Sequence, residues 1–110
     1  MDIKSFLADW LELSNNYNTE KYLEKYHEDA VLDDPSVGKT FAGHEGIRDY
    51  YTTYFIEYKT HTKLLALTIS GETADMEVEF TGDFPGGQIG GTFSFTFENG
   101  KISKVVAELK

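Results

Sequence analysis

The hydrophobic residues of this chain change their spacing halfway along the sequence, and that change limits the folds the chain can adopt. Over residues 3–17 they recur every three or four positions. This spacing indicates an amphipathic helix, for which Asp2 is a suitable N-cap. Over residues 74–84 they alternate with Asp, Glu and Thr, as they do in a strand with one buried face. The sequence therefore predicts helices first and a β-sheet afterwards.

Two further helices are predicted in the first half. The segment NNYN at residues 15–18 breaks the first helical pattern, and Asn18 or Thr19 can cap a short helix that follows. A loop with glycines at 38 and 43 leads to a third helix, whose apolar side lies within residues 47–58. These patterns predict three helices that each bury one side.

The predicted strands alternate in polarity or end at turn residues. Asn99-Gly100 is a strong signal for a tight hairpin between the last two strands. The strands are expected at residues 30–34, 61–70, 74–84, 89–98 and 102–110. Helices followed by an antiparallel meander predict an α+β fold in which the helices cover one face of the sheet. At 110 residues, we expect one domain over residues 1–110.

Charge and composition exclude several classes of function. The chain has 19 acidic and 10 basic residues and a formal net charge of −9, so we expect neither nucleic acid nor an anionic membrane as a partner. Its longest apolar stretch, LLALTI, is far shorter than the ~20 residues that span a bilayer. The N-terminus lacks the pattern of a signal peptide, and we expect a cytoplasmic protein. There is no cysteine, which excludes disulfides and thiolate nucleophiles.

The glycine-rich segment GDFPGGQIGG at residues 82–91 invites comparison with a phosphate-binding loop. A phosphate loop opens a helix and carries a Lys followed by Ser or Thr, whereas this segment lies between two strand patterns and no Lys follows it. We interpret it as a hairpin connection with a β-bulge around Gly90 and Gly91.

The three histidines do not form a metal-binding motif. His27, His44 and His61 are spaced too widely for HxH or HExxH, so their spacing predicts no shared metal ion. The chain also lacks the GxSxG motif of a serine nucleophile. We therefore predict neither a metal nor a cofactor.

Asp33 and Asp34 end an apolar strand directly before Pro35, and only one of them can share the inner face of that strand. Both faces are apolar upstream, so the alternation alone does not decide which carboxylate points inward. An Asp before Pro is also a common turn residue. A carboxylate enclosed by aromatic side chains would have a raised pKa and would be a useful proton acceptor.

Several longer segments resemble the SnoaL-like and ketosteroid-isomerase-like branch of the nuclear transport factor 2 superfamily. They are KYHEDAVLDDPSVG, GHEGIRDYYTTYF, FPGG and FENGKISKV, and the resemblance extends over essentially the whole chain. It implies three helices packed on a curved, mostly antiparallel sheet that forms a cone, a cystatin-like α+β barrel. Such motifs specify the fold better than the activity, because this fold has many functions.

The resemblance also assigns roles to single residues. Asp34 matches the general base of the isomerases, which implies that Asp34 faces the cone and Asp33 faces outward. Trp10 stands at the position of their first-helix tyrosine, and Phe93 at that of their protonated acid. Each loss of such an oxyanion donor typically costs ~10²–10³ in rate, so we do not expect steroid isomerase activity.

We therefore expect a cone with an apolar, aromatic pocket and Asp34 as candidate general base. The expected pocket-lining residues are Trp10, Tyr51, Tyr54, Phe55, Phe80, Phe93 and Phe95. One interpretation is proton-transfer catalysis of the isomerase or cyclase kind on a small apolar carbonyl or cyclic substrate. The alternative is a non-catalytic module that binds a small apolar ligand or forms a homodimer through the outer sheet face. Whether the chain is an enzyme stays open at this point.

Overall fold

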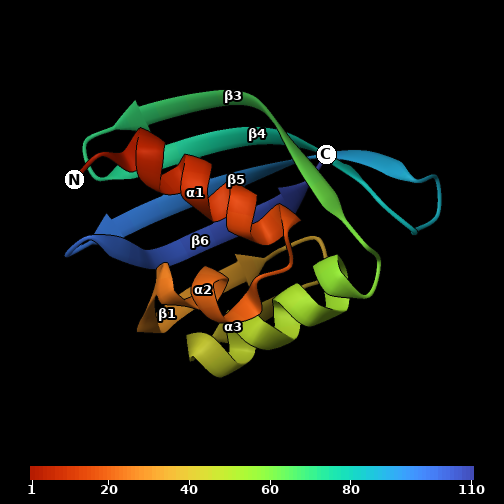
Figure 1. The fold of residues 1–110 in the computed structure, drawn as a ribbon, viewed down its shortest axis with the longest axis horizontal. Coiled ribbons are helices and arrows are strands. Elements are labelled where there is room, and N and C mark those ends of the chain that lie inside the picture. Colours follow the sequence, from red (N-terminus) through yellow and green to blue (C-terminus); the bar gives the residue numbers. More distant parts are fainter.

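Three helices and one π-helical turn lie against a six-stranded sheet in the computed structural model, which describes residues 1–110 (Figure 1). The helical elements are α1 (Ile3–Asn15), α2 (Thr19–Glu24), α3 (Gly43–Tyr51) and the π-helical turn η1 (Thr52–Ile56). The strands are β1 (Tyr26–Asp34), β2 (Lys39–Ala42), β3 (His61–Ser70), β4 (Thr73–Thr81), β5 (Gln88–Glu98) and β6 (Lys101–Leu109). The α+β class and the order of helices before the meander are confirmed. No helix is long and apolar enough to cross a membrane.

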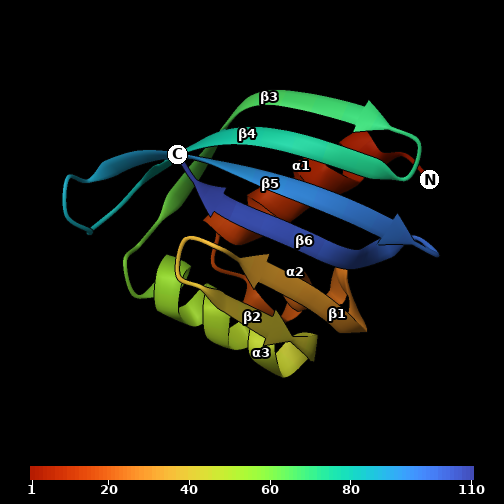
Figure 2. The ribbon, with the colours of Figure 1, turned by 180° about the vertical axis from the view of Figure 1, so that it is seen from behind.

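The strands are ordered β2-β1-β6-β5-β4-β3. All neighbours are antiparallel except β1 and β6, which are parallel. The sheet is curved but does not close on itself, so β2 and β3 are edge strands and the barrel is open. Helix α1 crosses the face formed by β3 to β6, whereas α3 lies beside β1 and β2 (Figures 1 and 2).

The first two helices begin at the residues that the sequence predicts. The Asp2 carboxylate accepts a hydrogen bond from the Ser5 N–H at 3.1 Å. Asn18 accepts one from the Lys21 N–H at 3.4 Å. Each cap satisfies an N–H group that has no partner within its own helix.

Alternation along the meander places one set of side chains inside. On β4 the buried positions include Met76, Val78 and Phe80, and Glu77 between them is half-buried on the outer face. The inner positions of β5 and β6 alternate in the same way, as period-two strands require. The helices and the inner face of the sheet share one hydrophobic core.

An asparagine side chain fixes the end of α1 to the start of β3. The Asn15 Nδ2 donates to the Thr62 carbonyl oxygen at 2.9 Å, and the Thr62 N–H donates to Asn15 Oδ1 at 2.8 Å. This pair of bonds imitates the pairing of a neighbouring strand. The Tyr51 hydroxyl ties α3 to α1 by donating to the Ser14 carbonyl oxygen at 2.7 Å.

The predicted bulge at Gly90 and Gly91 is wrong. The pairing of β4 with β5 is regular there, with Glu79 opposite Gly90 and Val78 opposite Gly91. A Cβ atom at Gly91 would lie only 2.5 Å from the Phe80 ring. The glycine therefore allows a close approach of that ring to the backbone.

Other element boundaries also differ from the predictions. Strand β1 begins at Tyr26, four residues before the predicted strand of residues 30–34, and β2 occupies part of the expected loop. Strand β4 ends at Thr81 rather than at residue 84. At Gly82 the backbone leaves the strand, and a Cβ atom there would lie 2.8 Å from the Tyr58 carbonyl oxygen.

Candidate functional site

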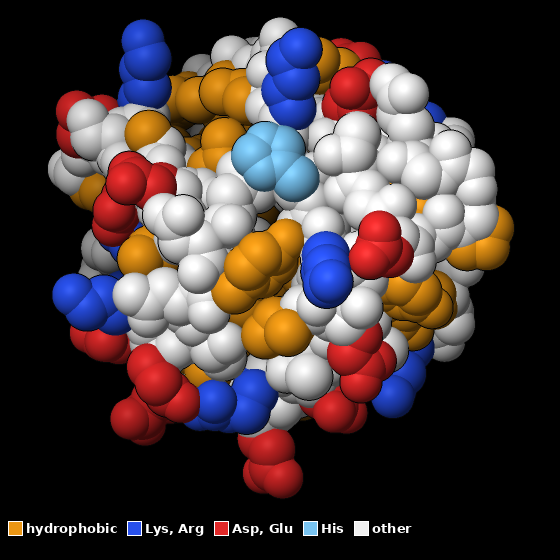
Figure 3. All heavy atoms as spheres, turned by 45° about the vertical axis from the view of Figure 1, so that its right-hand side comes forward, with side chains coloured by type: hydrophobic (Ala, Val, Ile, Leu, Met, Phe, Trp, Pro, Cys, Tyr) orange, Lys and Arg blue, Asp and Glu red, His pale blue; other side chains and the backbone are white.

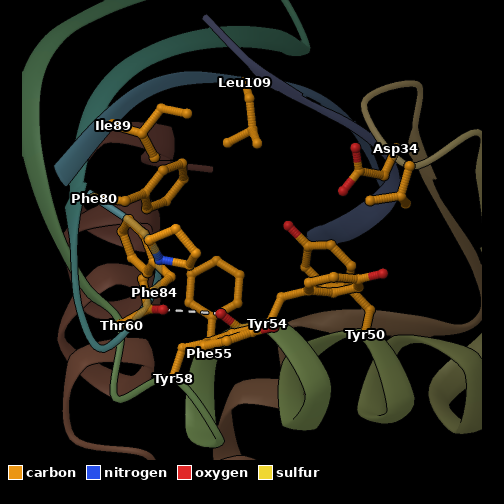
Figure 4. A pocket seen from close by; sticks show the side chains of 12 residues that line it. Asp34, Tyr50, Tyr54, Phe55, Tyr58, Thr60, Phe80, Phe84, Ile89 and Leu109 are labelled. Atoms are coloured by element: carbon orange, nitrogen blue, oxygen red, sulfur yellow. Dashed lines mark hydrogen bonds between the residues drawn. The ribbon is translucent and has the colours of Figure 1, made fainter. Parts of the chain in front are cut away.

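A cavity of about 320 Å³ lies between α3, η1 and one end of the sheet (Figure 4). This volume is at the small end of the usual range for ligand sites. Most of its lining is apolar. The lining residues are Asp34, Val37, Tyr50, Tyr54, Phe55, Tyr58, Thr60, Phe80, Phe84, Pro85, Ile89 and Leu109. The end of α3, the β4–β5 loop and the C-terminus meet at this end of the molecule (Figure 1).

Strand β1 directs Asp34 into the cavity. Ala30, Leu32 and Asp34 share its inner face and are buried, with Asp34 only 8% exposed. Asp33 lies on the opposite face, where it accepts a hydrogen bond from the Thr40 hydroxyl at 2.9 Å. The orientations of both carboxylates are those that the family resemblance implies. The catalytic role of Asp34 remains a prediction.

Burial raises the pKa of the Asp34 carboxyl above its ordinary value. Hydrogen bonds from the backbone N–H groups of Ser36 and Val37 act in the opposite direction, and the nearby charge of Asp33 raises the pKa further. The Ser36 N–H lies 3.0 Å from Asp34 Oδ1. Asp34 is therefore a partly desolvated carboxyl that is more easily protonated than a surface aspartate.

Asp34 has no basic partner. None of the three ion pairs of the structure includes it. Lys39 lies opposite Asp34 in the β1–β2 pairing, but its ammonium is over the Phe41 ring, 4.8 Å from the ring centroid. The carboxylate consequently faces the cavity without a counterion from the chain.

Tyr50 on α3 provides a hydroxyl in the same wall. Burial raises the pKa of Tyr50 well above its ordinary value, and the negative charge of Asp34 raises it further. The phenol is therefore neutral and can donate a proton in a hydrogen bond. Its hydroxyl makes no hydrogen bond within the chain, so it is free to bind a ligand atom.

The π-helical turn η1 brings two more aromatic side chains to the cavity, Tyr54 and Phe55. Two backbone hydrogen bonds here join residues five positions apart. The Glu57 N–H donates to the Thr52 carbonyl oxygen at 3.0 Å, and the Thr60 N–H donates to the Phe55 carbonyl oxygen at 2.8 Å. Such wide turns are frequent at functional sites. The Thr60 hydroxyl donates to the Tyr54 carbonyl at 2.8 Å and closes the wall (Figure 4).

The structure divides the expected pocket residues into two layers. Tyr54, Phe55 and Phe80 line the cavity. Trp10, Tyr51, Phe93 and Phe95 are fully buried in the core behind it. The Phe93 ring contacts Phe80 at 5.8 Å between centroids, and the Tyr51 ring stacks on Phe55 at 5.7 Å.

Trp10 is fixed within the core rather than directed at the cavity. Its indole Nε1 donates to the Tyr26 hydroxyl at 3.0 Å, which donates to the Tyr22 hydroxyl at 2.9 Å. Its ring packs edge-on against Phe93 and Phe95, at 5.2 and 5.1 Å between centroids. The single donor of the indole is thus already used.

Sequence reasoning missed several lining residues, most importantly Tyr50. A signal was present, because Tyr50, Tyr54 and Tyr58 are spaced four apart and share one side of a helix. Phe84 and Pro85 come from the β4–β5 loop, which has no periodic pattern to place it.

The histidines lie apart in the structure. His44 Nε2 lies 2.8 Å from the Tyr26 carbonyl oxygen, and His27 bonds the Glu98 carbonyl oxygen. No group of three or more His, Asp or Glu side chains has the arrangement of a metal site.

Comparison with solved structures identifies the same fold in bacterial proteins. A candidate polyketide cyclase from Sinorhizobium meliloti is 22% identical, with a TM-score of 0.85 over 94% of this chain and 93% of that one. A candidate ketosteroid isomerase from Kribbella flavida is 16% identical, with a TM-score of 0.84 over 96% and 76% of the two chains. At these identities the likeness shows the fold alone.

A third neighbour is a protein from Catenulispora acidiphila with a ketosteroid-isomerase-like fold, in complex with trimethylamine. It is 14% identical, with a TM-score of 0.82 over 93% of this chain and 82% of that one. No curated protein matches the chain.

The family comparison is the more direct result. The SnoaL-like domain matches residues 7–105. This range contains every helix and strand, except the first residues of α1 before Leu7 and the last residues of β6 after Val105. The match and the fold agree with the resemblance read from the sequence. The chain therefore belongs to the SnoaL-like domain family.

Proposed function

We propose that this protein binds a small, mostly apolar molecule in the cavity and that Asp34 accepts a proton from it. The observation that carries the proposal is that Asp34 is the one charged side chain among the residues lining an otherwise apolar cavity. A carboxylate in such surroundings is a stronger proton acceptor than one in water, because burial raises its pKa.

Proton transfer next to a carbonyl also needs a donor for the oxygen that becomes negative. Tyr50 supports this part of the proposal, because its hydroxyl is neutral, lies in the same wall as Asp34 and has no partner in the chain. A positioned donor of this kind typically contributes ~10²–10³ in rate. Tyr50 would take the place of the donors that Trp10 and Phe93 do not supply.

The structural neighbours support a small-molecule role in general terms. One is a candidate polyketide cyclase, another is a candidate ketosteroid isomerase, and a third is in complex with trimethylamine. Fold likeness at this identity does not specify an activity. The proposal therefore depends on Asp34 and Tyr50 of this chain.

The test uses cyclohexanone in D₂O as a probe of proton transfer. Exchange of its α-protons for deuterium, followed by NMR, reports a base that acts next to a carbonyl, whatever the natural substrate. We expect the protein to accelerate the exchange and Asp34→Asn to lower the acceleration by ~100-fold or more. Asp33→Asn is the matched control, because it removes the neighbouring carboxylate on the outer face, and it should retain the activity.

Tyr50→Phe separates the donor from the base. It should reduce the rate of exchange by more than it weakens binding of cyclohexanone, measured by saturation-transfer NMR. Binding without exchange would favour the non-catalytic ligand-binding alternative. Absence of both binding and exchange for a panel of small ketones would contradict the proposed function itself.

A further inference from the structure

The wall around Asp34 is unusually rich in aromatic rings. Three tyrosines and three phenylalanines line the cavity: Tyr50, Tyr54, Phe55, Tyr58, Phe80 and Phe84. Their rings are in contact, at 5.6 Å between the centroids of Tyr50 and Phe55 and 5.7 Å between those of Phe55 and Phe80. Figure 4 shows these rings around the hollow, with Asp34 at one side of it. Ring faces attract organic cations.

No positive side chain of the protein pairs with the Asp34 carboxylate. No Lys, Arg or His lines the cavity, and the Lys39 ammonium is held over the Phe41 ring. The Ser36 N–H bonds the Asp34 carboxylate, but a buried carboxylate without a positive partner is still costly for a protein. A positively charged ligand would supply the missing partner.

The charge of the whole molecule has the same sign as Asp34. The formal net charge is −9, and acidic side chains are spread over the face in Figure 3. A negative field raises the local concentration of cations and repels anions. Ligands that carry carboxylate or phosphate groups are disfavoured for the same reason.

We propose that the ligand of this cavity is a small organic cation with an alkylated ammonium group, held by the aromatic rings and paired with Asp34. This inference rests on the binding part of the proposed function, since it names the ligand class of the same cavity. The methyl and methylene groups of such a ligand would pack against the apolar wall. Its positive nitrogen would contact the aromatic rings and pair with the Asp34 carboxylate. A volume of about 320 Å³ suits a ligand of this size.

The experiment compares choline with 3,3-dimethylbutan-1-ol, which has the same shape but a carbon atom in place of the charged nitrogen. Isothermal titration calorimetry at low ionic strength measures both affinities. We expect choline to bind at least ~10-fold more tightly than the neutral alcohol, because cation–π attraction is strong where water is excluded.

Two variants test the two parts of the site. Asp34→Asn should weaken choline ~10-fold or more, whereas the control Asp33→Asn should change it less than ~2-fold, because Asp33 lies on the outer face of β1. Phe84→Leu keeps an apolar side chain but removes a ring, so it should weaken choline more than it weakens the alcohol. Circular dichroism verifies that each variant is folded.

The outcomes distinguish this inference from the function on which it rests. Equal or tighter binding of the neutral alcohol would overturn the ammonium inference and would leave the proposed apolar binding function intact. Choline affinity that is insensitive to Asp34→Asn would also overturn the inference. If neither compound binds, the inference is wrong, and exchange with cyclohexanone then decides the proposed function separately.

Discussion

Asp33 and Asp34 are neighbours with the same side chain, yet the fold gives them opposite environments. Asp34 lies on the inner face of β1, 8% exposed and without a cation, whereas Asp33 on the outer face bonds the Thr40 hydroxyl. Burial raises the pKa of the Asp34 carboxyl above its ordinary value. The comparison shows that the side of the strand, not the residue type, decides which carboxylate lines the cavity.

The largest expected effect is a loss of stability, and it compares the two faces of β1 at the residues just before Asp33 and Asp34. Leu32 is completely buried, and Val31 on the other face is half-buried. Leu32→Ala should reduce the free energy of unfolding by about 2–5 kcal/mol, as for other core truncations, and Val31→Ala should cost clearly less. Urea denaturation measures both. Equal losses of stability would contradict the structure, in which the Leu32 face of the strand is more deeply buried than the Val31 face.

The second prediction concerns stability and pH. Because burial raises the folded-state pKa of Asp34, the folded protein holds this proton more tightly than the unfolded chain does. Wild-type stability should therefore fall, relative to Asp34→Asn, as pH rises from about 4 (the ordinary Asp pKa) through the raised pKa. Above that pKa the variant should be more stable by a constant amount.

Thermal unfolding of wild type, Asp34→Asn and Asp33→Asn over a series of pH values provides the measurement. Asp33→Asn should follow the wild type within ~0.5 kcal/mol, as surface substitutions usually do. A wild type that gains stability relative to Asp34→Asn with rising pH would show that Asp34 is paired rather than desolvated.

The smallest effect is the influence of one acid on the other. The charge of Asp33 raises the pKa of Asp34, but it is the weakest of the causes that act on that group. Asp33→Asn should therefore lower the pKa of Asp34 slightly, as followed by ¹³C NMR of the side-chain carboxyl. Asp75→Asn serves as control, because Asp75 bonds Ser94 on the outer face of another strand, and it should leave that titration unchanged.

The sequence predicted the helices, the meander and the orientation of Asp34, because these depend on local periodicity, on caps and on a family motif. It did not predict β2, which is four residues long and too short for a pattern. It also did not predict that the Phe80 ring packs closely against the backbone at Gly91. This contact is between two strands, so no local pattern in the sequence indicates it.

The aromatic residues of the site were predicted less well than the fold. The four-residue spacing of Tyr50, Tyr54 and Tyr58 groups three residues that line the cavity, whereas the adjacent Tyr51 bonds Ser14 in the core. Spacing indicates such a group but does not show which side of the helix faces a cavity. Trp10 is buried as its spacing indicates, but burial does not distinguish a cavity wall from the layer behind it. The π-helical turn that carries Tyr54 has no sequence signature.

The pairing of Asn15 with Thr62 also has a consequence for self-association. An edge strand with free N–H and C=O groups is a template on which strands of other molecules can add and aggregate. At Thr62 both groups are already bonded to the Asn15 amide. The Asn15 side chain thus occupies the two backbone groups that Thr62 would otherwise offer, so a strand of another molecule cannot pair with β3 at this point, just ahead of the exposed Leu64 and Leu65.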